Sequence, residues 1–152
     1  MTIFALSSGP GISGVAVIRV SGKNTAYVIK KLTGSKLPSP RVATLKKFNK
    51  NGGKELIDEG VIIWFPAPNS YTGEDLAEFH VHGSRAVVKA MHSSISKIKN
   101  CRIAEPGEFT KTAYQNNRIN LYEAESIADL LQAETEAQRI QALRLKNSSP
   151  KF

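Results

Sequence analysis

The 152-residue chain is 41% hydrophobic and 22% charged and has one cysteine, which places it among ordinary globular proteins and outside the disulfide-rich secreted class. No apolar run reaches the roughly 18 residues of a membrane span, and no charged segment precedes the short apolar stretch at the N-terminus, so we expect a cytoplasmic protein without a membrane anchor. The net charge of +8 is uneven, because residues 1–54 carry ten Lys or Arg and no Asp or Glu, whereas residues 55–152 sum to −2. This asymmetry indicates either an anionic partner or a solvated basic surface.

The first half of the chain predicts mostly strands. Ala26, Ile29 and Leu32 recur at helical spacing, with Ser21 or Asn24 as the expected N-cap and Gly34 as the end of that helix. A turn rich in Asn and Gly at 49–53 lies between two β-rich runs and indicates a hairpin. The elements expected here are strands at 3–6 and 15–20, a helix at 23–33, a proline-punctuated connector at 37–40, and strands at 42–48 and 56–65.

The second half predicts more helix. Its expected elements are a strand at 76–82, a helix at 85–99 capped by Ser84, a short strand at 101–104, a short helix at 108–115, and one long amphipathic helix from Leu121 for about 25 residues. We therefore expect an α+β domain over 1–118, with a mixed or mostly antiparallel sheet flanked by helices. The segment 119–146 would begin a helical domain, and 147–152 would be a disordered tail.

The glycine-rich loop Gly9-Pro10-Gly11-Ile12-Ser13-Gly14 matches the dinucleotide-binding fingerprint in letters. That motif works by presenting a pyrophosphate to the N-terminus of a helix, whereas a strand is expected directly after this loop. The loop also lacks the Lys and Ser or Thr of a nucleoside triphosphate loop. Neither nucleotide-binding site is predicted.

Two charged residues fall on predicted strands. Arg19 is the one charge in an apolar run, so it either reaches water from an edge strand or is buried against a carboxylate or phosphate. Glu78 is either solvated or able to accept two parallel hydrogen bonds, as from the ring N–H and amino group that pterins and guanine present. Both alternatives stay open for each residue.

His80 and His82 are expected on the same strand face as Glu78, opposite Ala77, Phe79 and Val81. Two histidines at this spacing could bind a metal only if Cys101 or Glu78 joined them, and we do not expect this. Nucleophilic catalysis by Cys101 is not expected either, because a single cysteine in a strand is usually a buried small hydrophobe.

Several stretches together resemble the N-terminal part of the tRNA modification GTPase MnmE (TrmE) family. They are Gly14-Val15, Ile18-Arg19, Phe65–Asp75, Glu78, His82-Gly83, Pro106–Thr110 and Leu121–Leu130, in family order. The resemblance implies a fold similar to the tetrahydrofolate-binding domain of aminomethyltransferases. It also implies folate contacts at Arg19, Glu78 and Arg118, with 5-formyltetrahydrofolate or a related tetrahydrofolate as the ligand.

The resemblance further implies a homodimer that acts with the flavoprotein MnmG (GidA) to place an aminomethyl-type group on carbon 5 of the wobble uridine of tRNA. GTP, Mg and K would bind only to the family's GTPase domain, whose motifs this sequence lacks, so we expect no GTP hydrolysis by this chain. Two departures stand out. Ile12 replaces an Arg found in many members, and Arg118 replaces a frequent Lys.

The expected function is therefore folate binding and dimerisation within a tRNA-modifying GTPase. A competing interpretation is a basic tRNA-binding or nucleic-acid-binding module without a folate function. A third is a free-standing folate-dependent enzyme, for which His82 or Glu74 would have to serve as the base.

Overall fold

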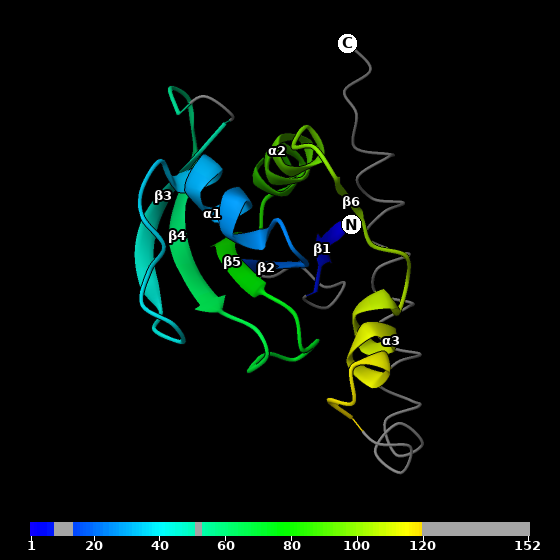
Figure 1. Ribbon diagram of the computed structural model, residues 1–152. Helices are drawn as coiled ribbons and strands as arrows, with labels where there is room; N and C mark the ends of the chain where they lie inside the picture. Colours follow the sequence, from blue (N-terminus) through cyan, green and yellow to red (C-terminus); the bar gives the residue numbers. More distant parts are fainter. Residues whose placement is uncertain (8–13, 51–52, 120–152) are drawn as a thin grey trace.

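The computed structural model describes residues 1–7, 14–50 and 53–119. Along the chain these residues form β1 (Thr2–Leu6), β2 (Val15–Ser21), α1 (Thr25–Thr33), β3 (Thr44–Asn49), β4 (Leu56–Phe65), β5 (Leu76–His82), α2 (Arg85–Ser96), β6 (Cys101–Ile103) and α3 (Glu108–Gln115) (Figure 1). The expected strands and short helices are therefore present, in the expected order. The long helix expected over 119–146 and the tail at 147–152 lie almost wholly outside the described residues.

The six strands form one mixed sheet in the order β3-β4-β5-β2-β1-β6. All neighbouring strands are antiparallel except β1 and β6, which are parallel. The expected mixed, mostly antiparallel sheet is confirmed. The strand β2 lies in the interior of the sheet, between β5 and β1, so its residues from Ile18 to Ser21, Arg19 among them, have a partner on both sides.

The two faces of the sheet are covered to different extents. Strand residues that alternate toward one face, such as Ile18, Phe79 and Ile62, pack with apolar side chains of α1 and α2 into the main core. On the other face, Phe109 of α3 packs against Ile3 and Ala5 of β1 in a second, smaller cluster. Figure 1 shows α1 and α2 over the sheet and α3 at the β1 and β6 end.

Helix ends differ from the prediction in two places. Ser84 caps α2 as expected, since its Oγ accepts a hydrogen bond from the Val87 N–H at 3.2 Å. Ser21 is not a cap of α1: it ends β2, and its hydroxyl lies 2.7 Å from the Thr72 hydroxyl. The helix α2 ends at Ser96 rather than near residue 99: Lys97 is its C-cap, and the Ile98 N–H bonds to the Ile95 carbonyl oxygen at 3.0 Å, three residues back, so the α-helical bonding stops there.

The Asn24 side chain also fails to cap α1, although Asn24 occupies the N-cap position. Its amide Nδ2 instead donates to the Lys99 carbonyl oxygen at 3.0 Å, which ties the start of α1 to the segment after α2. Within the described residues, no helix is both long and apolar enough to cross a membrane.

The register of β4 against β5 requires a glycine at position 60, so we predict that Gly60→Ala destabilises the fold. A Cβ at Gly60 would lie 2.1 Å from the backbone oxygen of His80, which cannot move without breaking the strand pairing. We expect a loss of about 1 to 3 kcal/mol in the free energy of unfolding, measured by urea denaturation. The control is Gly14→Ala, where a Cβ would meet nothing within 4 Å and the change should stay below about 1 kcal/mol. Equal effects of the two substitutions would contradict the prediction.

Candidate functional site

Arg19 and Glu78 stand directly opposite each other on the adjacent strands β2 and β5. The Arg19 Nη2 atom lies 3.6 Å from Glu78 Oε2, and the two side chains are 21% and 22% exposed. Because β2 is an interior strand, an edge-strand arginine reaching water is ruled out, as is a fully solvated Glu78. A guanidinium stays protonated in proteins, and the register supplies a carboxylate that offsets the partial burial of its charge.

Two aromatic rings flank the guanidinium. The Arg19 Cζ atom lies 5.1 Å from the centroid of the Tyr71 ring and 5.5 Å from that of Phe109. These are cation–π distances, and the Tyr71 hydroxyl is fixed in turn at 2.9 Å from Thr110 Oγ1. The Arg19 Nε atom is buried and has no hydrogen-bond partner among the described residues. The guanidinium is thus held in place while one of its donors is unsatisfied.

Glu78 has a second neighbour on its own strand. Its Oε1 atom lies 3.1 Å from His80 Nε2, while Oε2 faces Arg19. A carboxylate offers about four acceptor positions, so these two contacts leave capacity for further donors. Since the side chain is still one-fifth exposed, the carboxylate is fixed in orientation and remains accessible to a ligand with donor groups.

Arg118 forms no hydrogen bond or ion pair with Arg19 or Glu78 in the described part of the chain, but it holds the loop that carries Tyr71. Its Nε donates to the Ser70 carbonyl oxygen at 3.0 Å, and Asn116 Nδ2 donates to the Thr72 carbonyl oxygen at 2.8 Å. The residues after α3 therefore bind the loop on both sides of Tyr71. Arg118 is thus connected to Arg19 indirectly: it binds Ser70, and the neighbouring Tyr71 ring lies against the Arg19 guanidinium. Arg19 in turn faces Glu78.

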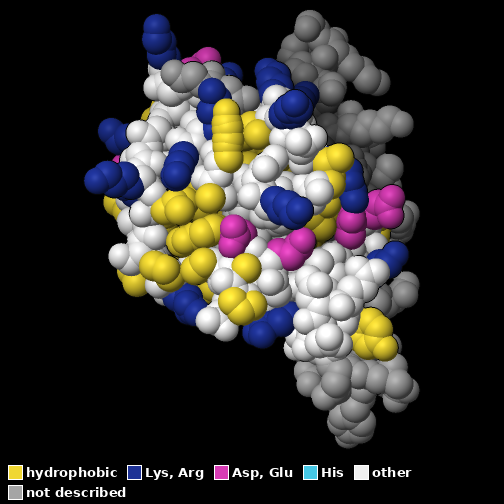
Figure 2. Space-filling view, viewed as in Figure 1, with side chains coloured by type: hydrophobic (Ala, Val, Ile, Leu, Met, Phe, Trp, Pro, Cys, Tyr) yellow, Lys and Arg dark blue, Asp and Glu magenta, His cyan; other side chains and the backbone are white. Residues whose placement is uncertain are grey.

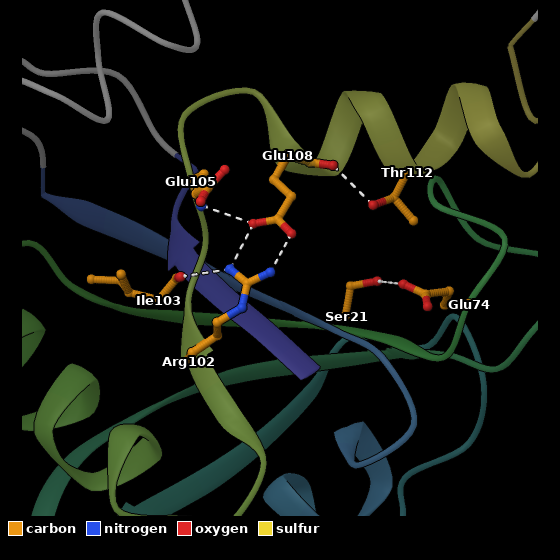
Figure 3. Close-up of polar contacts among 7 residues, drawn as sticks. All are labelled: Ser21, Glu74, Arg102, Ile103, Glu105, Glu108 and Thr112. Carbon is orange, nitrogen blue, oxygen red and sulfur yellow. Dashed lines mark hydrogen bonds and ion pairs between the residues drawn. The ribbon is translucent and has the colours of Figure 1, made fainter. Parts of the chain in front are cut away.

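Glu74, considered above as a base, belongs to the same loop. Its Oε1 accepts a hydrogen bond from the Ser21 hydroxyl at 3.1 Å, as Figure 3 shows, and Ser70 Oγ donates to its backbone oxygen. The side chain thus fastens the loop to the end of β2. This contact gives Glu74 a structural role in the loop.

A bidentate ion pair fixes the start of α3. The two Nη atoms of Arg102 lie 2.8 and 2.6 Å from the two carboxylate oxygens of Glu108, and the Glu105 N–H also donates to Glu108 at 2.9 Å (Figure 3). The hydrogen bonds from Arg102 hold the pKa of Glu108 below its usual value. Because Phe109 follows Glu108, this pair sets where the second ring against Arg19 lies.

The histidine at the end of β5 has its own carboxylate. Asp58 of β4 accepts hydrogen bonds from the His82 backbone N–H at 2.8 Å and lies 2.8 Å from His82 Nδ1. Partial burial acts to raise the pKa of Asp58, but the bonds from His82 and from the Glu59 N–H outweigh it, so this pKa is lowered. The ring of His82 is therefore engaged with Asp58, on the neighbouring strand.

The cysteine lies away from this cluster. Cys101 is on β6, which pairs with β1, while β2 separates β1 from β5. Its side chain packs against the main core, and burial raises the pKa of the thiol, which disfavours a nucleophilic thiolate. No group of three or more His, Cys, Asp or Glu side chains suited to a metal occurs in the described part of the chain.

The described site is thus a charged pair on the less covered face of a small α+β domain, held by two aromatic rings and a pinned loop. A family model described as the N-terminus of the GTP-binding protein TrmE matches residues 2–118. The chain belongs to this TrmE N-terminal family, as the resemblance indicated.

The chain is 67% identical over its full length to the tRNA modification GTPase MnmE of Pelagibacter ubique and covers 35% of that protein. It is 49% identical to the MnmE of Brucella anthropi, over 97% of this chain and 33% of the relative. It is also 50% identical to a mitochondrial 5-taurinomethyluridine-tRNA synthase subunit of Danio rerio, over 94% of this chain and 28% of the relative. The chain spans about a third of the length of these relatives.

The Asp58–His82 contact predicts a defined pH dependence of stability. The folded-state pKa of Asp58 is below its usual 3.8. The contribution of Asp58 to the free energy of unfolding is therefore complete above about pH 4, and it is lost as the pH falls through the lower folded-state pKa. We expect Asp58→Asn to cost about 1 kcal/mol near pH 7, and this difference from wild type to shrink on acidification, in urea titrations between about pH 7 and 3. His82→Ala removes the imidazole but keeps the backbone N–H bond to Asp58. It should therefore lower the free energy of unfolding by less than Asp58→Asn, and this loss should also shrink on acidification. A difference for Asp58→Asn that stays constant with pH would refute the assignment.

Proposed function

We propose that this chain binds a reduced folate, 5-formyltetrahydrofolate or a related tetrahydrofolate, at the Arg19–Glu78 pair. The observation that carries the proposal is the Glu78 carboxylate, which is partly buried, held by Arg19 and His80, and still accessible on the less covered sheet face. The folate supplies a one-carbon unit when bound. The residues of this chain supply recognition and orientation.

The donor and acceptor groups of the site suit a pterin. The ring N–H and the 2-amino group of a pterin can donate two parallel hydrogen bonds, which a fixed carboxylate such as Glu78 accepts well. The buried, unsatisfied Nε of Arg19 offers a donor beside it, and Tyr71 and Phe109 keep that guanidinium from moving. Arg118 uses Nε to hold the loop at Ser70, which leaves its Nη groups to meet an anionic part of the folate.

We further propose that the chain serves as the folate-binding and dimerisation part of a tRNA modification GTPase. The names of its relatives in Pelagibacter ubique and Brucella anthropi support a role in tRNA modification. In this role it acts with the flavoprotein MnmG on carbon 5 of the wobble uridine, and GTP hydrolysis belongs to a separate GTPase domain. The free-standing enzyme is not favoured, because Glu74 and His82 are both engaged in structural contacts.

Replacing Glu78 should weaken folate binding without unfolding the chain. A hydrogen bond to a charged group contributes about 1.5 to 3 kcal/mol, so Glu78→Ala should lower the affinity for 5-formyltetrahydrofolate at least about tenfold in isothermal titration calorimetry. Glu59→Ala, which removes an exposed carboxylate from the neighbouring strand β4, is the matched control and should bind like wild type. Circular dichroism of each variant checks the fold. Equal affinities of wild type and Glu78→Ala would remove Glu78 from the site.

Dimerisation is tested by sedimentation equilibrium of the full chain. We expect a dimer whose dissociation constant falls when 5-formyltetrahydrofolate is added, because in this proposal the folate binds the dimer more tightly than the monomer, and such a ligand favours the associated state by linkage. In Glu78→Ala the dimer should persist while the effect of the folate disappears. A chain that sediments as a monomer at all accessible concentrations, with and without folate, would contradict the proposal for dimerisation. The proposal for folate binding would still be decided by the calorimetry.

A further inference from the structure

The helices α1 and α2 and their flanking residues carry positive charge without any negative charge. The segments 23–36 and 84–100 each contain four Lys or Arg and no Asp or Glu. Both segments cover the same sheet face, the one opposite the Arg19–Glu78 pair. In Figure 2, dark blue side chains lie over α1 and α2, and most of the magenta side chains in view lie below them or to the right.

A hollow of ≈ 530 Å³ opens between the end of α2 and the outer side of α1. Lys31 of α1 lines it from one side, and Lys97 and Lys99 line it from the other. The aromatic side chain of Tyr27 also lines it and is 49% exposed. Residues about 70 positions apart in the sequence thus combine three cations and one accessible ring in a single concavity.

A second hollow, of ≈ 580 Å³, adjoins the first. It runs along the outer side of α2 toward the β3–β4 hairpin and shares Lys97 with the first hollow. Lys50 and Lys89 line it as well, with Lys50 paired to Glu55 at 3.0 Å. The two hollows, here called the lysine groove, share Lys97 and are together lined by five lysines and one carboxylate, Glu55.

The lysines of the first hollow are not neutralised within the domain. In the described ranges, no carboxylate lies within 4.0 Å of the ammonium group of Lys31, Lys97 or Lys99. Lysines near a helix C-terminus also offset the helix dipole, which accounts for Lys31 in the last turn of α1. The dipole does not account for the exposed Tyr27 ring that lines the same hollow.

We infer that the lysine groove binds a single-stranded polynucleotide segment, with the lysines on successive phosphates and the Tyr27 ring stacked on one base. Cationic grooves with an accessible aromatic ring are the usual means of binding single strands without strong sequence preference. The groove lies on the sheet face away from the folate site, so this inference does not depend on the proposed folate binding. Tyr27 and Lys31 are one turn apart on α1, and the packing of α2 beside α1 adds Lys97 and Lys99 to the same hollow.

The test is fluorescence anisotropy of the full chain with a labelled oligouridine RNA of about 12 nucleotides. The double variant Lys97→Ala, Lys99→Ala should bind at least about tenfold more weakly than wild type at low salt. Each lost phosphate contact lowers the slope of log affinity against log salt by about 0.7, so the slope should fall by about 1.4. The matched control Lys47→Ala, Lys111→Ala removes the same charge from β3 and α3 and should change affinity less than about twofold. Equal losses in both double variants would overturn the inference.

Tyr27→Ala separates base stacking from charge. It should weaken RNA binding at least about fivefold with little change in the salt slope, and should not change binding of inorganic polyphosphate, which has no bases. No effect of Tyr27→Ala on RNA binding would overturn the assignment, as would tighter binding to anionic phosphatidylserine vesicles than to RNA.

A labelled oligothymidine of the same length shows whether RNA is preferred over DNA. Glu78→Ala should bind RNA like wild type, so failure of the folate proposal and failure of this one give different results.

Discussion

A permanently charged side chain in the middle of the sheet is the constraint on which the rest of the site depends. Arg19 sits on an interior strand, where its guanidinium cannot reach bulk water freely and cannot become neutral. Pairing β2 with β5 in antiparallel register brings Glu78 opposite it, and a shift by one residue would place Glu78 on the helix-covered face. The sheet register and the charge pair therefore support each other.

Two segments that are themselves fixed by polar contacts place aromatic rings against this pair: the loop before β5 and the start of α3. Tyr71 reaches Arg19 from a loop that Arg118 holds at Ser70. Phe109 reaches it from α3, whose start is fixed by the ion pair of Glu108 with Arg102. The Arg102–Glu108 pair is therefore connected to the Arg19–Glu78 pair through one aromatic ring, that of Phe109. A ligand at Glu78 would meet a surface that is already ordered before it binds.

The sheet also divides the domain into two chemically different sides. One face is closed by α1 and α2, whose apolar residues form the main core and whose outer surface is entirely basic in charge. The other face is closed by α3 only near β1, which leaves the polar residues of β5 accessible. A small domain can in this way carry two sites for unlike ligands, because the sheet separates the Arg19–Glu78 pair from the lysines of α1 and α2.

Local patterns in the sequence were enough to predict most elements, since alternation in 76–82 and helical spacing in 85–95 reflect side chains facing one core. Arg19, Glu78 and the family were also accessible from the sequence, because an isolated charge in a strand and a long ordered motif are local features. Tertiary structure alone decided that Ser21 pairs with Thr72 rather than capping a helix, that Tyr71 and Phe109 lie against Arg19, and that Tyr27, Lys97 and Lys99 line one hollow. These contacts join segments that are distant in the chain, and only the packing of strands and helices brings such segments within reach of one another.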